Sequence, residues 1–128
     1  MITWNIQGRR IDAATFLSMK PVDVLYDFDG PRIFTAVSND GEVLCCLVDT
    51  DDTIDRYIVA PTSQAIIERL KQGLCTVRAA LAQPWVWVID VSDDAVITDG
   101  WQCDFADIPE DVLPAARAML RPELEPFL

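Results

Sequence analysis

The sequence contains no histidine among its 128 residues. Histidine is the side chain that most often serves as a general base near neutral pH, and its imidazole is a common zinc ligand. Without it, serine and cysteine nucleophiles lack their usual proton acceptor. The patterns G-x-S-x-G and G-x-x-x-x-G-K-[ST] are absent as well. These absences predict a protein that is not an enzyme and that binds no cofactor.

Long apolar runs are also missing. The longest one covers residues 43–48, whereas a membrane-spanning helix needs about 20 predominantly apolar residues. Near the N-terminus, Arg9 and Arg10 follow a mixed stretch instead of preceding an apolar one, which is not the order found in a signal peptide. We therefore expect neither a transmembrane segment nor a signal peptide, and no membrane partner.

The four cysteines lack the spacing of a metal site or of a disulfide framework. Cys45 and Cys46 are adjacent in an apolar run, Cys75 and Cys103 stand alone, and no C-x-x-C pair occurs. The apolar run offers no positive charge to stabilise a thiolate, so we expect Cys45 and Cys46 to be core residues. The pattern favours reduced, mostly buried thiols in a cytoplasmic protein.

Basic residues are few and acidic residues are abundant. Asp and Glu number 21 against 10 for Lys and Arg, which gives a formal net charge of −11. Because 51% of the residues are hydrophobic and four are tryptophan, the chain can form a core and differs from a disordered acidic tail. We expect a single domain over residues 1–128 whose surface repels nucleic acid and anionic membranes and attracts basic proteins.

Segments rich in alternating, β-branched and aromatic residues predict strands. The segments are residues 2–6, 22–28, 32–38, 42–49, 54–60, 85–91 and a last one that includes 95–98. Asn39-Asp40-Gly41 predicts a tight hairpin, because glycine adopts positive φ without strain. Residues 22–60 therefore predict a four-stranded meander.

Two helices are expected between the strands at 54–60 and 85–91. Thr62 or Ser63 can cap the first, whose apolar residues fall on one face, and Gly73 stands at its C-terminal end. Thr76 caps the second, which runs to Gln83.

Two further regions have helical features. Residues 11–19 show apolar spacing and predict a short helix, and residues 108–120 have helical composition interrupted by Pro114, which favours two short pieces. Residues 122–128 are expected to be extended. Together the segments predict an α+β fold, with an antiparallel β-sheet of about five to six strands and two or three short helices packed on one face.

Three stretches of the sequence resemble a family of small bacterial proteins of unknown function. The first is Tyr26-Asp27-Phe28-Asp29-Gly30-Pro31 with Phe34, which carries a Tyr-x-Phe-Asp-Gly-Pro signature. The second runs from Tyr57 to Pro61-Thr62-Ser63, and the third runs from Gly73 to Arg78-Ala79-Ala80-Leu81 and is followed by Pro84 and Trp87. The likeness spans about residues 22–91. It implies no activity for this chain.

Two groups of carboxylates have features of cation sites. Asp23, Asp27 and Asp29 follow a predicted strand and its exit, where they could bind a divalent cation or act as acid and base. The alternative is a solvated face that ends in a turn. Residues 49–55 have oxygen ligands at alternating positions but lack the central glycine and terminal glutamate of a calcium loop, so we interpret them as an exposed acidic loop.

The excess of acid predicts a non-catalytic module that engages or blocks a basic partner protein. Concrete forms are an immunity protein or antitoxin and an inhibitor or DNA mimic of a nucleic-acid enzyme. The acidity is dense in the C-terminal third, where Trp101 is a candidate interface anchor. The predicted partner-binding residues are Asp93, Asp94, Asp99, Trp101, Asp104 and Asp107, with Asp49, Asp51 and Asp52 as a second patch.

Two other classes remain open, and the sequence does not define the oligomeric state. An accessory or structural subunit of a larger bacterial assembly, such as a phage-defence complex, would use the apolar tail Phe127-Leu128 and the edge strands, and its binding would be insensitive to salt. A metal-dependent enzyme would place Asp23, Asp27 and Asp29 around a cation and would gain thermal stability from added metal.

Overall fold

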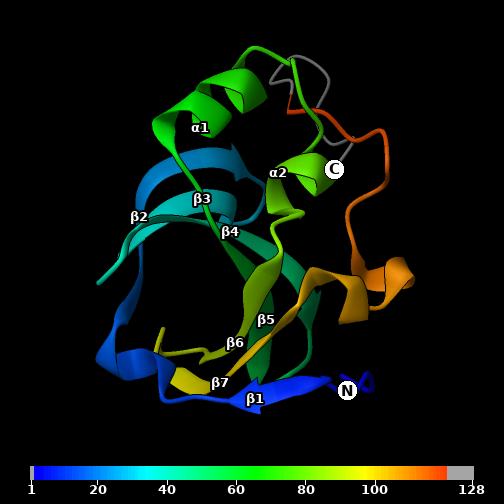
Figure 1. Ribbon diagram of the computed structural model, residues 1–128. Helices are drawn as coiled ribbons and strands as arrows, with labels where there is room; N and C mark the ends of the chain where they lie inside the picture. The colour runs from blue at the N-terminus through cyan, green and yellow to red at the C-terminus, as the bar shows by residue number, and fades with distance from the viewer. Residues whose placement is uncertain (1, 121–128) are drawn as a thin grey trace.

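Residues 2–120, which the computed structural model describes, form a curved antiparallel sheet of seven strands with two α-helices (Figure 1). The strands are β1 (Gly8–Arg10), β2 (Leu17–Asp27), β3 (Pro31–Ser38), β4 (Gly41–Thr50), β5 (Ile54–Pro61), β6 (Trp85–Ser92) and β7 (Ile97–Asp104). Their spatial order is β1-β7-β6-β5-β4-β3-β2. Strands β2 to β7 therefore form a meander, and β1 is added at its far edge by pairing with β7.

The four-stranded meander predicted for residues 22–60 is confirmed as β2 to β5. Its hairpin at Asn39 and Asp40 connects Ser38 to Gly41, which face each other across β3 and β4. Gly41 has a φ of 130°, a conformation that side-chain-bearing residues rarely adopt. The turn chemistry of this short segment was therefore sufficient to fix the pairing of the two strands.

The two helices predicted between β5 and β6 are also confirmed. They are α1 (Gln64–Lys71) and α2 (Val77–Leu81). Ser63 Oγ accepts a hydrogen bond from Ile66 N at 3.3 Å, and Thr76 Oγ1 accepts one from Ala79 N at 3.0 Å. Each cap satisfies a backbone N–H that has no partner within its own helix. Neither helix is long and apolar enough to cross a bilayer, and this holds for every helix in residues 2–120.

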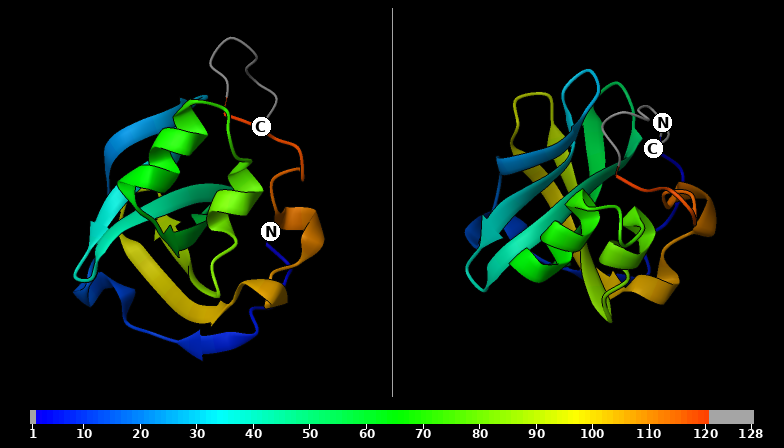
Figure 2. Two further views of the ribbon diagram at one scale, coloured as in Figure 1. Left: turned by 45° about the horizontal axis from the view of Figure 1, so that its top comes forward. Right: turned by 90° about the horizontal axis from the view of Figure 1, so that it is seen from above.

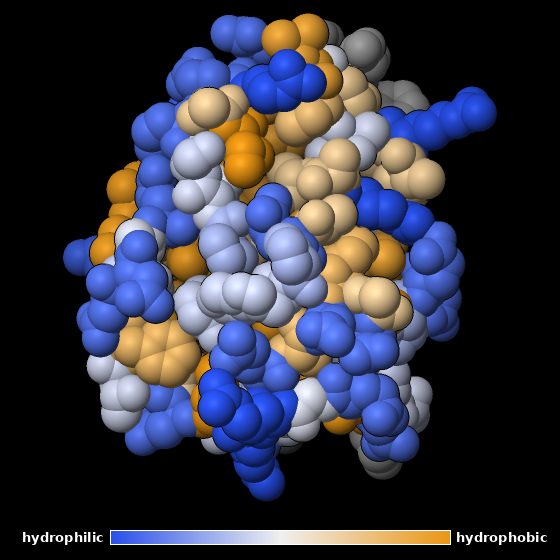
Figure 3. Space-filling view, in the orientation of Figure 1, coloured by the Kyte–Doolittle hydropathy of each residue, from blue (hydrophilic) through white to orange (hydrophobic). Residues whose placement is uncertain are grey.

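The sheet has an apolar core on each of its faces. On the first, which we call the helix face, α1 and α2 cover the sheet, and the fully buried residues include Leu44, Ile58, Ile67, Leu70, Leu81 and Val88. On the second, the buried residues include Ala13, Leu17, Phe34, Val59 and Trp87. In the orientation of Figure 1, apolar residues gather around α2, while hydrophilic residues cover much of α1 and of the lower part of the view (Figure 3).

The second face is covered by residues 11–19, which we call the crossing segment because they run from the end of β1 into the first residues of β2 (Figure 2, left). Ile11 N donates a hydrogen bond to Gly100 O of β7, and Phe16 O accepts one from Asn39 N, both at 2.9 Å. The Phe16 ring also packs 5.3 Å from the Trp87 ring, measured between centroids. The segment is thus held at one end by β7 and at the other by the β3–β4 turn.

The prediction of a short helix over residues 11–19, the crossing segment, was wrong. The segment holds one 3-10 turn, η1 (Ala13–Thr15), and β2 begins at Leu17. The apolar residues that indicated a helix instead pack on the second face, and tertiary contacts override the local preference. The strand predicted for residues 2–6 was also wrong, because the first strand covers Gly8–Arg10.

The strand count and the packing of the helices differ from the prediction as well. Seven strands are present in residues 2–120 instead of five to six, and β7 is long enough to contain Trp101. Residues 108–120 form no α-helix and contain only the 3-10 turn η3 (Glu110–Val112), which begins after Pro109. A further 3-10 turn, η2 (Phe105–Asp107), precedes it. Two α-helices pack on the helix face, whereas η1 lies on the opposite face. The predicted extended tail, residues 122–128, lies outside the described residues.

Candidate functional site

Three turns that carry carboxylates lie at the same end of the sheet (Figure 2, right). They are the β2–β3, β4–β5 and β6–β7 turns, which an antiparallel meander places at one end. Ile54 pairs with Ser92, so the β4–β5 and β6–β7 turns are neighbours. We define the acidic turn surface by five residues of these turns, which are Asp29, Asp51, Asp52, Asp93 and Asp94.

The β4–β5 turn is organised by Asp51. Its Oδ1 accepts hydrogen bonds from Thr53 N at 2.8 Å, Thr53 Oγ1 at 2.9 Å and Ile54 N at 3.0 Å. The backbone N–H groups of Thr53 and Ile54 are the main cause that lowers the Asp51 pKa to about 2. The carboxylate therefore stays charged at any physiological pH, and the turn holds a fixed shape.

The other two turns contain residues with positive φ. Asp29 has a φ of 57° and Ala95, which follows Asp94, has a φ of 62°. Aspartate tolerates this conformation better than most residues, whereas an alanine there is uncommon. Asp29, Asp52, Asp93 and Asp94 are exposed, and within residues 2–120 none of the five carboxylates of the acidic turn surface forms an ion pair. Their charges therefore face solvent.

Trp101 and Asp49 belong to a different group, which surrounds Arg56 on the helix face. Arg56 makes a bidentate pair with Asp90, with Nε–Oδ1 at 2.7 Å and Nη2–Oδ2 at 2.9 Å. Its Cζ lies 4.7 Å from the Trp4 ring centroid and 5.4 Å from that of Trp101. Asp49 Oδ2 accepts a hydrogen bond from Trp4 Nε1 at 2.9 Å. These residues hold the N-terminal segment against the sheet.

Asp99 is paired with a basic residue that is distant in sequence. Its Oδ1 accepts a hydrogen bond from Arg10 Nε at 2.8 Å, and Arg10 Nη2 contacts its second oxygen. The hydrogen bond from Arg10 is the main cause that lowers the Asp99 pKa from its usual value. Asp99 is therefore partly neutralised and serves to attach β1 to β7.

The nine predicted partner-binding residues thus fall into three places. Asp51, Asp52, Asp93 and Asp94 come together in the acidic turn surface, joined by Asp29, which the sequence analysis considered for a cation site or acid–base chemistry, or as part of a solvated turn. Asp49, Asp99 and Trp101 take part in contacts within the protein. Asp104 is exposed at the opposite end of β7, where it pairs with Trp85 at the start of β6, and Asp107 is exposed in η2 just beyond it. Successive turns of a meander lie at alternate ends of the sheet, so every second turn shares an end. This rule could have grouped the turn residues from the sequence.

The candidate metal and nucleophile residues have structural contacts. Asp23 Oδ2 forms an ion pair with Lys71 Nζ at 2.7 Å, and the described residues contain no group of three His, Cys, Asp or Glu side chains arranged to hold a metal. Cys45 and Cys46 are free and buried, as predicted. Burial raises the pKa of both thiols, that of Cys46 to about 12, so both stay protonated.

The fold and the turns together define a mostly β domain with one acidic end. Comparison with models of protein families, with curated proteins and with solved structures finds no match for this chain. The resemblance carried by residues 26–31 therefore stays a prediction.

Proposed function

We propose that this protein is a non-catalytic binding module that engages or blocks a basic partner protein through the acidic turn surface. The observation that supports the proposal is the grouping of five carboxylates, without an ion pair among residues 2–120, at one end of the sheet. Of the five remaining candidates, Asp49, Asp99 and Trp101 are engaged within the protein, and Asp104 and Asp107 lie at the opposite end of β7.

The electrostatics of such a surface suit a basic partner. A field of one sign attracts an oppositely charged protein over distance and raises the association rate, and it rejects partners of like charge. Each exposed carboxylate is screened by salt, so the interaction should weaken as the ionic strength rises. An immunity protein, an antitoxin or an inhibitor that mimics the charge of DNA, acting in the bacterial cytoplasm, is the form of function that fits this behaviour.

The test compares two variants with the same change in net charge. Asp52→Asn/Asp93→Asn/Asp94→Asn alters the acidic turn surface, and Asp12→Asn/Asp40→Asn/Glu68→Gln alters three exposed acids elsewhere. Each protein is immobilised and incubated with native cell extract, and the retained proteins are identified by mass spectrometry. We expect the unmodified protein and the second variant to retain one basic protein that the first variant loses.

Salt dependence completes the experiment. At about 0.5 M salt the Debye length is roughly 4 Å, so the retained protein should be released. Equal loss in both variants would show that net charge alone is responsible, and retention by the turn variant or at high salt would contradict the proposal.

A second candidate function, an accessory subunit of a larger assembly, is favoured by the open edge of β2. Three valines on β2 and its neighbour β3 are exposed, namely Val22 at 65%, Val24 at 43% and Val37 at 51%. An apolar edge of this kind can pair with another chain. Binding there would persist at high salt and would be unaffected in both variants. The tail Phe127-Leu128 that this alternative also used lies outside the described residues.

A further inference from the structure

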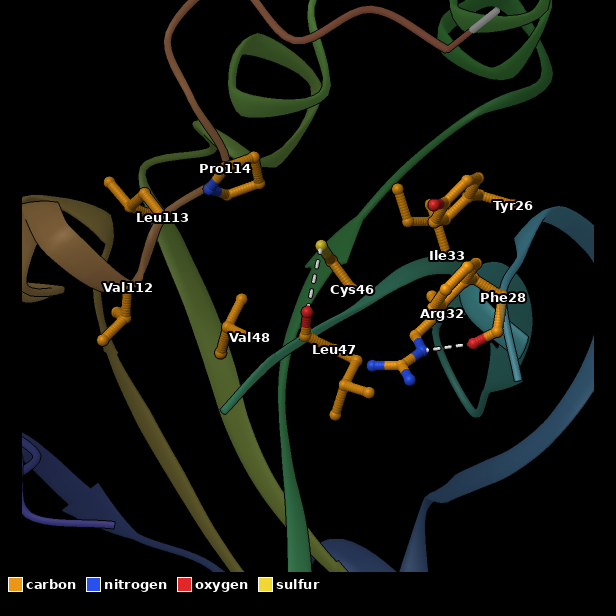
Figure 4. A pocket seen from close by; sticks show the side chains of 10 residues that line it. All are labelled: Tyr26, Phe28, Arg32, Ile33, Cys46, Leu47, Val48, Val112, Leu113 and Pro114. Atoms are coloured by element: carbon orange, nitrogen blue, oxygen red, sulfur yellow. Dashed lines mark hydrogen bonds between the residues drawn. The ribbon is translucent and has the colours of Figure 1, made fainter. Parts of the chain in front are cut away.

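A pocket of about 220 Å³ lies at the end of the sheet near the acidic turn surface. Figure 4 shows β2, β3 and β4 on one side of the pocket and the chain around Leu113 and Pro114 on the other. Ile33, Val48, Leu113 and Pro114 contribute apolar side chains to the lining, and about half of its exposed surface is polar. The pocket is therefore suited to a small ligand that has both an apolar and a polar part.

One charged side chain, Arg32, lines this pocket. Arg32 Nε donates a hydrogen bond to Phe28 O at 2.7 Å, and Arg32 Cζ lies 5.9 Å from the Phe28 ring centroid. These contacts fix the guanidinium, which Figure 4 shows directed toward Leu47. Its Nη1 and Nη2 atoms have no hydrogen-bond acceptor within residues 2–120, so both can donate to a ligand.

We propose that this pocket binds a small monocarboxylate with an apolar body, its carboxylate on Arg32 and its body against the apolar lining. A guanidinium matches a carboxylate in shape and can donate two parallel hydrogen bonds to it. A volume of about 220 Å³ equals that of about seven liquid waters, which suits a ligand with one ring and a short acid group.

The lining disfavours other classes of ligand. A cation would be repelled by Arg32, and a neutral apolar molecule would cover the guanidinium without giving it an acceptor, which costs free energy. A ligand that is polar throughout would cover the apolar side chains of Ile33, Val48, Leu113 and Pro114 without matching them. This inference is separate from the proposed function, since it concerns Arg32 and not the carboxylates.

The test uses phenylacetate, which has one ring and one carboxylate, and the neutral phenylacetamide. Each is titrated into the full-length ¹⁵N-labelled protein at about 0.15 M salt, where the Debye length of about 8 Å screens the nearby carboxylates. We expect saturable amide shifts near residues 26–33, 46–48 and 112–114, with a Kd on the order of 1 mM. Phenylacetamide should bind at least about tenfold more weakly, because it lacks the charge-assisted hydrogen bonds.

A matched pair of variants locates the binding group. Arg32→Gln should weaken phenylacetate binding at least about tenfold. Arg69→Gln is the control, because Arg69 is exposed and its Nη2 also donates to a turn carbonyl, Leu74 O, at 3.2 Å. It should bind phenylacetate as the unmodified protein does. The comparison of phenylacetate with phenylacetamide needs no variant, so it still tests the proposal if Arg32→Gln misfolds. No saturable shift, equal binding of the amide, or equal loss in both variants would overturn the proposal.

Discussion

The Arg56–Asp90 pair is a buried charge pair in a small protein. Arg56 is 8% exposed and Asp90 is 4% exposed, and each satisfies the other through two hydrogen bonds. Arg56 Nη1 also donates to Trp4 O at 3.2 Å. Removing two charges from water is costly, and the cost is offset only while both partners are present. The stability of this region therefore depends on the pair as a unit.

We predict that Arg56→Met lowers the free energy of unfolding by about 3–5 kcal/mol, because it leaves the Asp90 carboxylate buried without a partner. Urea unfolding followed by tryptophan fluorescence measures the change. Arg10→Met, which breaks the exposed pair with Asp99, is the control and should have a much smaller effect. An Arg56→Met cost no larger than that of the control would contradict the prediction.

The crossing segment is the element that depends most on close packing. A Cβ placed on Gly100 would lie 2.9 Å from Ala13 Cβ, which is too close, and 3.2 Å from Ile89 Cδ1, which is tight. Glycine therefore lets the segment pass close over β7.

We predict that Gly100→Ala destabilises the protein by about 1–3 kcal/mol by pushing the crossing segment away from β7. Thermal unfolding and the exchange rate of the Ile11 amide, which is bonded to Gly100 O, measure the effect. The double variant Ala13→Gly/Gly100→Ala removes the clash with Ala13 and should recover part of the loss. Full stability of the single variant would show that the segment adjusts without cost.

Local chemistry accounts for the elements that the sequence predicted correctly. The Asn39-Asp40-Gly41 turn and the caps Ser63 and Thr76 act within a few residues, so their signals can be read directly. The crossing segment failed because its partners are distant: Ile11 bonds to Gly100 and Phe16 packs on Trp87. Apolar spacing alone did not distinguish a helix from a segment fixed by such contacts.

The candidate site was predicted in part for the same reason. The sequence placed Asp99 among the partner-binding candidates of an acid-rich third of the chain, yet Arg10 reaches it from 89 residues away. Arg56 reaches Asp90 from 34 residues away in the same manner. The carboxylates of the β4–β5 and β6–β7 turns were predicted as partner-binding residues. They lie side by side only because β5 pairs with β6, which the sequence did not show.

At the scale of the whole molecule, the two ends of the sheet differ in how their charges are paired. The acidic turn surface holds carboxylates without an ion pair within residues 2–120, whereas the other end carries charges of both signs, and Lys71 and Arg78 there pair with Asp23 and Glu110. A field of one sign is therefore expected to be strongest at the turns. This difference cannot be inferred from the net charge alone.

The stability of the whole protein should also depend on pH in the alkaline range. Burial is the main cause that raises the pKa of Cys46 and Tyr57 to about 12 and that of Cys103 to about 11, from usual values of 9.0 for cysteine and 10.0 for tyrosine. A raised pKa in the folded state means that the unfolded chain loses these protons first. The stability from these groups is complete below about pH 9 and is lost as the pH rises through 11 and 12.

We therefore predict that the urea midpoint falls between about pH 8 and about pH 10.5, because the unfolded state ionises its thiols in this range. Unfolding curves at the two pH values, measured under reducing conditions, provide the test. Cys46→Ala should lower the stability at both values and make the decline with pH smaller. A constant midpoint across this range would show that the buried thiols do not contribute.

The pairing of β1 with β7 joins the beginning of the chain to a strand that is made late. Arg9 Nη2 donates to Gln102 Oε1 across 93 residues, so the contact forms only after most of the sequence has been synthesised. Contacts of this separation slow folding, and they leave the intermediate open until they form. Until β7 has emerged from the ribosome, the crossing segment lacks the strand to which Ile11 bonds. It is then not held over Phe34, Val59 and Trp87. During synthesis this apolar sheet face therefore lacks the cover that the crossing segment gives it in the folded protein.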